Sequence, residues 1–211
     1  ALAKQKLTEI DNYANNAKPF QDDYEKAIEL DPQRWNLYAE IGSIRYKAKD
    51  YAGAVEAYVN RLDSLQVRTA LDYYQIGLAH FMLRDSADYS KAADYFTKVT
   101  EIVPDKTTGW IMKAKSLSKL EPDVDSYPER IGEFGKAKDA FDHFVTIAEQ
   151  DTLVNRNKDL VSAYEYLAYY YILQKDTEQV SAYLKKLSAL DPDSEVVAGI
   201  KEWLTQDASE D

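Results

Sequence analysis

The feature that most constrains this chain is an internal repeat. A small residue recurs at intervals of 35, 37 and 54 residues, at Gly42, Gly77, Ala114 and Ala168. A glycine or alanine where two helices cross lets their backbones approach closely, because any larger side chain would hold them apart. Second small residues follow the first three, at Ala54, Ala92 and Ala137. This periodicity predicts an array of helix–turn–helix units.

Composition agrees with an all-helical array. The 211 residues include seven glycines and six prolines, about half of the roughly 7% and 5% that average usage would give. So few chain breakers argue against a many-turned β-sandwich or barrel. The absence of cysteine excludes disulfides, thiolate catalysis, iron–sulfur clusters and cysteine-ligated zinc.

Charge and hydropathy restrict the partners. The formal net charge is −11, which disfavours nucleic acid, because binding to phosphates relies on clusters of lysine and arginine. No apolar run approaches the ~18 residues of a membrane span, so membrane insertion is not expected. The 17 tyrosines are too many for surface decoration and are expected to fill the space between repeats.

The first complete copy carries Tyr38, Gly42, Asp50, Ala54 and Tyr58 in order. Together with the later copies, these residues resemble the tetratricopeptide repeat, a helix–turn–helix unit of 34 residues. The resemblance implies an all-α, right-handed α-solenoid, a superhelix of stacked units. It divides the array 1–192 into a partial or degenerate repeat at 1–34 and repeats at about 35–68, 69–105, 106–150 and 159–192.

Several positions depart from the repeat pattern. Unusual residues for the family stand at Lys113, Arg61 and Gln66. Three extra residues are predicted in the turn at Asp85–Asp88 and about eleven at Glu121–Ile131, both inside a repeat and projecting from the same edge. About nine more fall around Gln150–Leu160, between repeats. Asp31-Pro32 and Asp191-Pro192 end a repeat and can start the next helix, with aspartate as the cap and proline in the first turn.

The two ends of the chain differ. Val196, Val197, Ile200, Trp203 and Leu204 share one helical face and predict a capping helix at 193–204, followed by an acidic, disordered tail at 205–211. No such cap precedes the first repeat, where the apolar residues are Leu2, Leu7 and Ile10. We therefore expect the chain to be the C-terminal portion of a longer array, or its first helix to dock on a partner or a second copy.

No catalytic or cofactor-binding motif is evident. His80 is predicted to be a packed core imidazole, and His143 to lie on the surface. The carboxylates Glu121, Asp123, Asp125 and Glu129 could ligate calcium, but their loop lacks the central glycine and the closing glutamate of the helix–loop–helix site. A solvated acidic turn is the favoured interpretation. Enzymatic activity and cofactors are therefore not expected.

The resemblance also locates a binding groove, because in this family the first helix of each repeat lines the concave surface. The lysines and asparagines that clamp a terminal carboxylate in the chaperone-binding members are replaced here, at Ala39, Ser43, Tyr74 and Leu78. The predicted groove is instead apolar with some positive charge. Its residues are Tyr46, Lys47, Leu71, Tyr74, Leu78, Phe81, Met82, Ile111, Lys115, Lys119 and Tyr169.

Such a groove suits a protein or peptide with apolar anchors and some acid. The favoured function is a non-catalytic interaction scaffold or adaptor that holds a peptide or helix. The alternative is a structural or oligomerising segment of a longer, multidomain protein, possibly an enzyme or regulator, in which the same side chains are covered by upstream repeats or a second copy. The uneven insertions resemble bacterial proteins of this family, several of them exported, and favour the periplasm over the cytoplasm.

Overall fold

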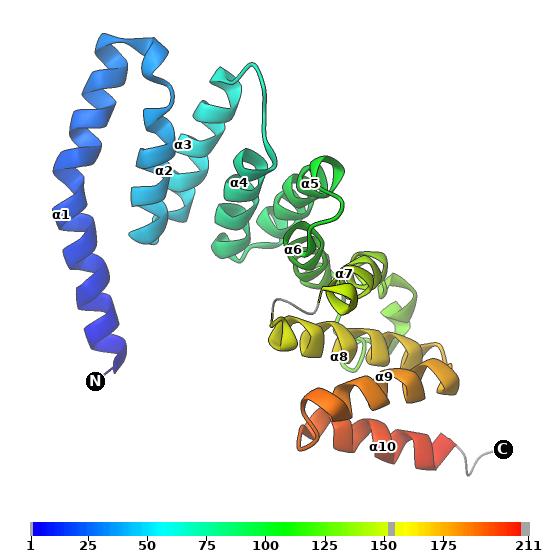
Figure 1. The fold of residues 1–211 in the computed structure, drawn as a ribbon. Helices are drawn as coiled ribbons and strands as arrows, with labels where there is room; N and C mark the ends of the chain where they lie inside the picture. The colour runs from blue at the N-terminus through cyan, green and yellow to red at the C-terminus, as the bar shows by residue number, and fades with distance from the viewer. Residues whose placement is uncertain (1, 152–154, 208–211) are drawn as a thin grey trace. The chain divides into compact units, whose positions relative to one another are not determined.

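The computed structural model describes residues 2–151 and 155–207, with the side chains of residues 2–7, 11, 14, 15 and 207 outside that description. Within these residues the chain is helical and contains no strand (Figure 1). Its helices are α1 (Leu2–Leu30), α2 (Leu37–Lys47), α3 (Tyr51–Ser64), α4 (Ala70–Leu83), α5 (Ser86–Ile102), α6 (Thr107–Ser118), α7 (Lys138–Gln150), α8 (Asn157–Leu173), α9 (Thr177–Leu190) and α10 (Glu195–Asp207), with short 3-10 helices at Pro32–Arg34 and Pro128–Glu133.

The helices pack on their neighbours in chain order and form two units. The first unit ends at Pro104, and in it each helix from α1 to α5 packs on the next. The second unit begins at Asp105 and stacks α6 to α10 in the same way. This arrangement of adjacent helix pairs is the all-α solenoid packing that the repeat predicted.

The predicted helix crossings are confirmed in the first unit. Gly42 of α2 is buried, and a Cβ placed there would overlap the ring of Tyr58 on α3. A Cβ on Gly77 of α4 would approach the Phe96 ring to 3.1 Å. Glycine at these two points therefore makes room for an aromatic ring between paired helices.

The turns of three hairpins share two features. Lys49, Arg84 and Lys175 each adopt a left-handed conformation, with φ between 56° and 62°. The aspartate that follows each of them caps the next helix by accepting a hydrogen bond from a backbone N–H in its first turn. These aspartates are Asp50, Asp85 and Asp176.

This turn corrects the predicted insertion at Asp85–Asp88. With two residues between α4 and α5, this turn is one residue shorter than the turns at Lys49 and Lys175, and the extra residues lengthen α5, which has 17 residues against 14 in α3 and in α9. Asp88 therefore lies inside α5 and is available to other partners.

The C-terminal helix α10 packs on the core of the second unit. Val197 and Ile200 are buried there, and Trp203 and Leu204 pack around them, while Val196 remains 41% exposed. The helix does not start at Asp191-Pro192, because Asp191 is the C-cap of α9 and α10 begins three residues after the proline. It also continues to residue 207, so the first residues of the predicted tail are helical. Residues 208–211 lie outside the described residues.

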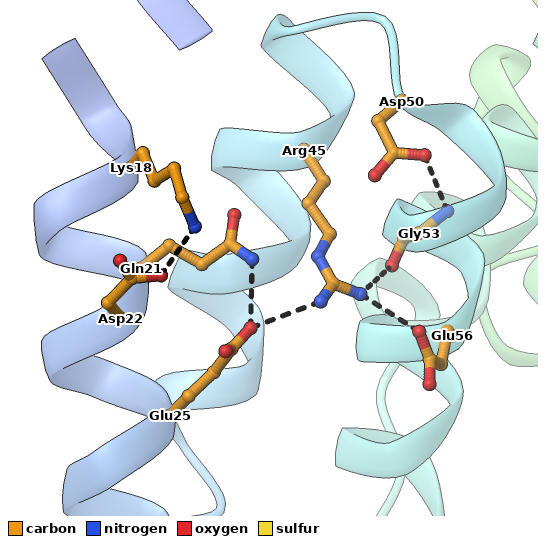
Figure 2. Close-up of polar contacts among 8 residues, drawn as sticks. All are labelled: Lys18, Gln21, Asp22, Glu25, Arg45, Asp50, Gly53 and Glu56. Atoms are coloured by element: carbon orange, nitrogen blue, oxygen red, sulfur yellow. Dashed lines mark hydrogen bonds and ion pairs between the residues drawn. The ribbon is translucent and has the colours of Figure 1, made fainter. Parts of the chain in front are cut away.

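At the other end, the predicted partial repeat forms one long helix. With 29 residues, α1 spans about 44 Å at 1.5 Å per residue, against about 17 Å for the 11 residues of α2. Arg45 of α2 joins the two helices and α3. Its guanidinium donates to Glu25 of α1 at 3.1 Å, and to Glu56 and the Gly53 carbonyl of α3, both at 3.0 Å (Figure 2).

The structure explains why an arginine stands at position 61, one of the departures from the repeat pattern. Its guanidinium pairs with Asp72, a carboxylate that is 4% exposed near the start of α4. Thr69, the residue before α4, completes a capping box with Asp72. Burial would raise the pKa of Asp72, but hydrogen bonds from Thr69 and the Arg61 charge outweigh it and lower that pKa. The pair links α3 to α4.

Candidate protein-binding surface

In the first unit, the predicted groove residues lie mainly on α4. Buried Ile76, Gly77 and Ala79 form the inner side of this helix. The opposite stripe is also apolar and follows the helical period, with its members three or four residues apart. Leu71 is 61% exposed and the others are partly buried: Tyr74, Leu78, Phe81 and Met82. A helix that is apolar all round has a second partner or a buried position.

Aromatic rings from α5 support this stripe. Phe81 meets the Tyr89 ring edge-on, with centroids 5.4 Å apart, and Tyr74 lies 5.6 Å from the Phe96 ring. Phe96 is fully buried, so the stripe continues into the core of the hairpin. Contacts of this kind hold the rings in place, and an ordered surface loses less conformational entropy when a partner binds.

On α2, the two predicted residues belong to different surroundings. Tyr46 is half-buried against the core of the first unit, which includes Tyr58 and Ile76. Its ring packs edge-on to the Tyr51 ring, with centroids 5.3 Å apart. Burial raises its pKa, with further contributions from Tyr51 and Tyr74, which places Tyr46 near the α4 stripe. Lys47 is exposed and lines a separate cleft of about 420 Å³ with Lys49 and residues of α1.

In the second unit, three of the four predicted groove residues already have partners within the protein. Ile111 is 5% exposed and belongs to the core cluster, so little of it is accessible to a ligand. Lys115 donates to Asp159 of α8 at 2.6 Å, and Tyr169 donates to Asp125 at 2.8 Å. Lys119, which follows α6, is exposed.

Those partners come partly from the long loop between α6 and α7. Glu121 Oε1 accepts hydrogen bonds from the Ala137 backbone and from the Tyr166 hydroxyl, both at 2.8 Å. The Phe134 ring stacks on Tyr166 with centroids 5.3 Å apart. The loop was predicted to project as a solvated acidic turn. That interpretation is wrong for Glu121, which is partly buried and bonded to α8, whereas Asp125 is exposed and also accepts a hydrogen bond from Tyr169.

These contacts explain the tyrosine pKa values on α8. Burial raises the pKa of Tyr166, and the hydrogen bond to Glu121 raises it further. Burial and the hydrogen bond to Asp125 raise the pKa of Tyr169 to about 12. Both hydroxyls therefore remain protonated donors at neutral pH. Among the described residues, no group of three or more His, Cys, Asp or Glu side chains is placed to hold a metal ion.

The histidines are placed as predicted. His80 is 5% exposed, with Nδ1 2.8 Å from Asp88 and its ring stacked on Tyr95. Burial lowers the pKa of His80, an effect that Asp88 partly opposes. His143 is exposed and stacks on Trp110, with centroids 4.3 Å apart. Sequence reasoning did not identify Asp88 as the partner of His80, although the two residues are eight apart along one hairpin.

Comparison with known proteins defines the class of fold. No protein-family profile matches the chain, and neither does any curated protein sequence. Solved structures do match, and they are helical repeat proteins. The C-terminal part of a TPR repeat-containing protein from Cytophaga hutchinsonii is 23% identical, with a TM-score of 0.71 over 95% of this chain and 75% of that one.

Two further structures agree. YrrB, described as a TPR protein with an unusual peptide-binding site, is 18% identical, with a TM-score of 0.61 over 90% of this chain and 89% of its own. MamA is 16% identical, with a TM-score of 0.59 over 85% of this chain and 94% of its own. The chain therefore has the fold of tetratricopeptide repeat proteins. In the part that the structure describes, no helix has both the length and the apolar character needed to cross a membrane.

Proposed function

We propose that this chain is a non-catalytic protein-interaction module that binds an apolar segment of a partner on the α4 surface of its first unit. The observation that carries the proposal is the second apolar stripe of α4, with Leu71 61% exposed at one end of it. Burying a leucine or phenylalanine completely stabilises by about 1.5–3 kcal/mol. Several partly exposed side chains in one row therefore supply enough area for a peptide or an amphipathic helix.

The chemistry of this surface favours apolar anchors over a charged terminus. Tyr46 and Tyr74 add hydroxyl groups to an otherwise apolar row, and Lys47, the residue after Tyr46, contributes positive charge although it lines the separate cleft on α1. A partner with leucine or aromatic anchors and a flanking carboxylate fits this composition. YrrB, which has the same fold and a peptide-binding site, supports the proposal by fold analogy.

The test compares two exposed leucines. A Leu71→Ser variant and a matched Leu30→Ser variant, whose leucine is 79% exposed at the end of α1, are used with the wild type to select from a displayed library of amphipathic helical peptides. Fluorescence anisotropy then measures the affinity of each selected peptide. We expect Leu71→Ser to weaken binding about tenfold and Leu30→Ser to leave it unchanged. Equal binding by all three proteins would remove α4 from the proposal.

Self-association through the N-terminal helix is a second candidate function. The 420 Å³ cleft on α1 is lined by Ile10 and Tyr13, together with Lys47 and Lys49. The side chains of Leu2 and Leu7, which the sequence places on this helix, lie outside the described residues. Sedimentation velocity at 5 and 100 µM distinguishes the two candidates. A dimer that Tyr13→Glu dissociates favours self-association, whereas a monomer at both concentrations favours the α4 surface.

A further inference from the structure

A second concave site lies in the first unit, away from the stripe on α4. It is a cleft of about 570 Å³, a volume typical of ligand pockets, and it is lined by α1, α2 and α3 together with the proline after α1. The floor is apolar, because Ile41 is 1% and Ala57 2% exposed. Half-buried Ile28 and Tyr38 form its sides.

The rim of this cleft is acidic. Glu25, Glu29 and Glu56 all line it, and Arg45 is the cation among its lining residues. Figure 2 shows Arg45 between Glu25 and Glu56, which it joins at 3.1 and 3.0 Å. Three carboxylates against one guanidinium leave the rim with an excess of two negative charges.

Three hydrogen bonds hold the Arg45 guanidinium in the cleft, and it cannot leave without losing them. One terminal nitrogen donates to Glu56 and to the Gly53 carbonyl, and the other donates to Glu25. Glu25 also accepts from Gln21, one turn earlier on α1. The guanidinium thus organises two carboxylates at the rim. Glu29 is exposed one turn after Glu25, and none of the ion pairs of the described residues involves it.

We propose that this cleft binds a basic–apolar segment of a partner protein, in which a lysine or arginine is flanked by an apolar side chain. The apolar neighbour fills the space over Ile41 and Ala57, and the cation lies between Glu29 and the carboxylates that Arg45 positions. Exposed ion pairs contribute little affinity, about 0.2–1 kcal/mol each, so the apolar floor supplies most of the binding and the carboxylates supply selectivity. An acidic segment is repelled by the same rim.

This inference does not rest on the proposed function of α4. The cleft is formed by α1, α2 and α3, whereas the stripe is on α4. Different substitutions therefore test the two surfaces. Charge complementarity identifies the occupant of the cleft as basic, whereas the apolar α4 stripe favours a partner with leucine or aromatic anchors. The two sites therefore select different segments.

The experiment uses the whole chain and a defined probe. The probe is a fluorescein-labelled peptide with the core Leu-Arg-Leu-Leu-Arg-Leu between Gly-Ser flanks, and the comparison peptide has glutamate in place of both arginines. The protein variants are Glu29→Lys and its control Asp23→Lys. Both residues are exposed on α1 and undergo the same charge reversal, but Asp23 is not part of the cleft lining.

We expect the arginine peptide to bind at least tenfold more tightly than the glutamate peptide. Glu29→Lys should weaken the arginine peptide about tenfold, and Asp23→Lys less than twofold. Asn60→Trp, at an exposed position of the rim, should also weaken it by narrowing the cleft. Circular dichroism checks that all three variants remain folded.

Three results would overturn the inference. Equal weakening by Glu29→Lys and Asp23→Lys would show attraction to the net charge of −11 rather than a site. Equal binding of the two peptides would show that the rim carboxylates do not select a basic segment. Sedimentation that shows a dimer lost in Glu29→Lys would assign the cleft to a second copy of the chain instead of a partner protein.

Discussion

The two units are built from the same kind of helical hairpin but treat the equivalent face of their first helices differently. In the first unit, α4 leaves an apolar row partly open, including Leu71 at 61% exposure. In the second unit, Ile111 lies in the core, and Lys115 and Tyr169 are bound to carboxylates of the same unit. The same repeat position can thus be partly open in one unit and hold the protein together in the next.

Part of this difference arises from the loop between α6 and α7. It provides Glu121 and Asp125 as acceptors for two tyrosine hydroxyls of α8, and Phe134 as a ring that stacks on one of them. In the first unit, the corresponding turns at Lys49 and Arg84 are short and supply no such groups. Insertion length therefore separates a surface open to partners from one covered from within.

The largest effect is expected when Glu121 is replaced by alanine. The buried N–H of Ala137 and the hydroxyl of Tyr166 both lose a charged acceptor, so the second unit should lose about 3 kcal/mol in its free energy of unfolding. Urea denaturation in a Trp35→Phe background follows Trp110 and Trp203 of that unit. Glu133→Ala, which removes an exposed ion pair from the same loop, is the control and should leave the midpoint unchanged.

A loss below about 1 kcal/mol for Glu121→Ala would contradict this comparison. It would mean that the loop is not fastened to α8 through that carboxylate.

A smaller, pH-dependent effect is expected in the first unit alone. The pKa of His80 is lowered by burial, so the unfolded chain takes up a proton more readily than the folded one. The stability that neutral His80 contributes is complete above its unfolded pKa of about 6.5. It is lost as the pH falls through the lower pKa of the folded state.

Hydrogen exchange measured between pH 7.5 and 5.5, corrected for intrinsic rates, should show α4 and α5 losing protection by up to about 1 kcal/mol. The second unit, whose described histidine is exposed His143, is the internal reference. His80→Gln should remove the pH dependence from α4 and α5. Loss of protection of the same size in α8 would contradict the assignment to His80.

The smallest effect is expected for Tyr169→Phe. This change removes one hydrogen bond to the exposed carboxylate of Asp125 and should cost about 0.5–1 kcal/mol. Backbone exchange in residues 123–127 should become faster, while α4 is unaffected. Unchanged exchange in this segment would show that Phe134 and Glu121 are sufficient to hold the loop.

The sequence predicted the helical hairpins well and the partners of individual side chains poorly. Gly42 and Gly77 have a strong signal, because a close helix crossing allows almost no other residue and the crossings recur with the repeat. Asp85 and Asp88 have the same chemistry, so the pattern could not tell which of them caps α5. The left-handed residue that precedes the cap in three hairpins, and the hydrogen bond that Asp85 accepts from the Ala87 backbone, decide for Asp85.

Contacts between distant residues had no sequence signal. Glu121 and Tyr166 are 45 residues apart, and nothing in either local pattern shows that the loop returns to α8. Arg61 could be recognised as unusual for its repeat, but its partner Asp72 belongs to the next hairpin. Ile111 was assigned to the groove from its helical position alone, whereas its burial depends on how α6 packs against α7 and the rest of that core.

The left-handed turns have a consequence for protein engineering. Lys49, Arg84 and Lys175 carry side chains where φ is about +60°, a conformation that costs roughly 1 kcal/mol or more for residues other than glycine and asparagine. Replacing each by asparagine should recover part of that cost, and the gains should add because the turns lie in separate hairpins. The three substitutions should therefore raise the melting temperature without altering the α4 stripe or the cleft around Arg45.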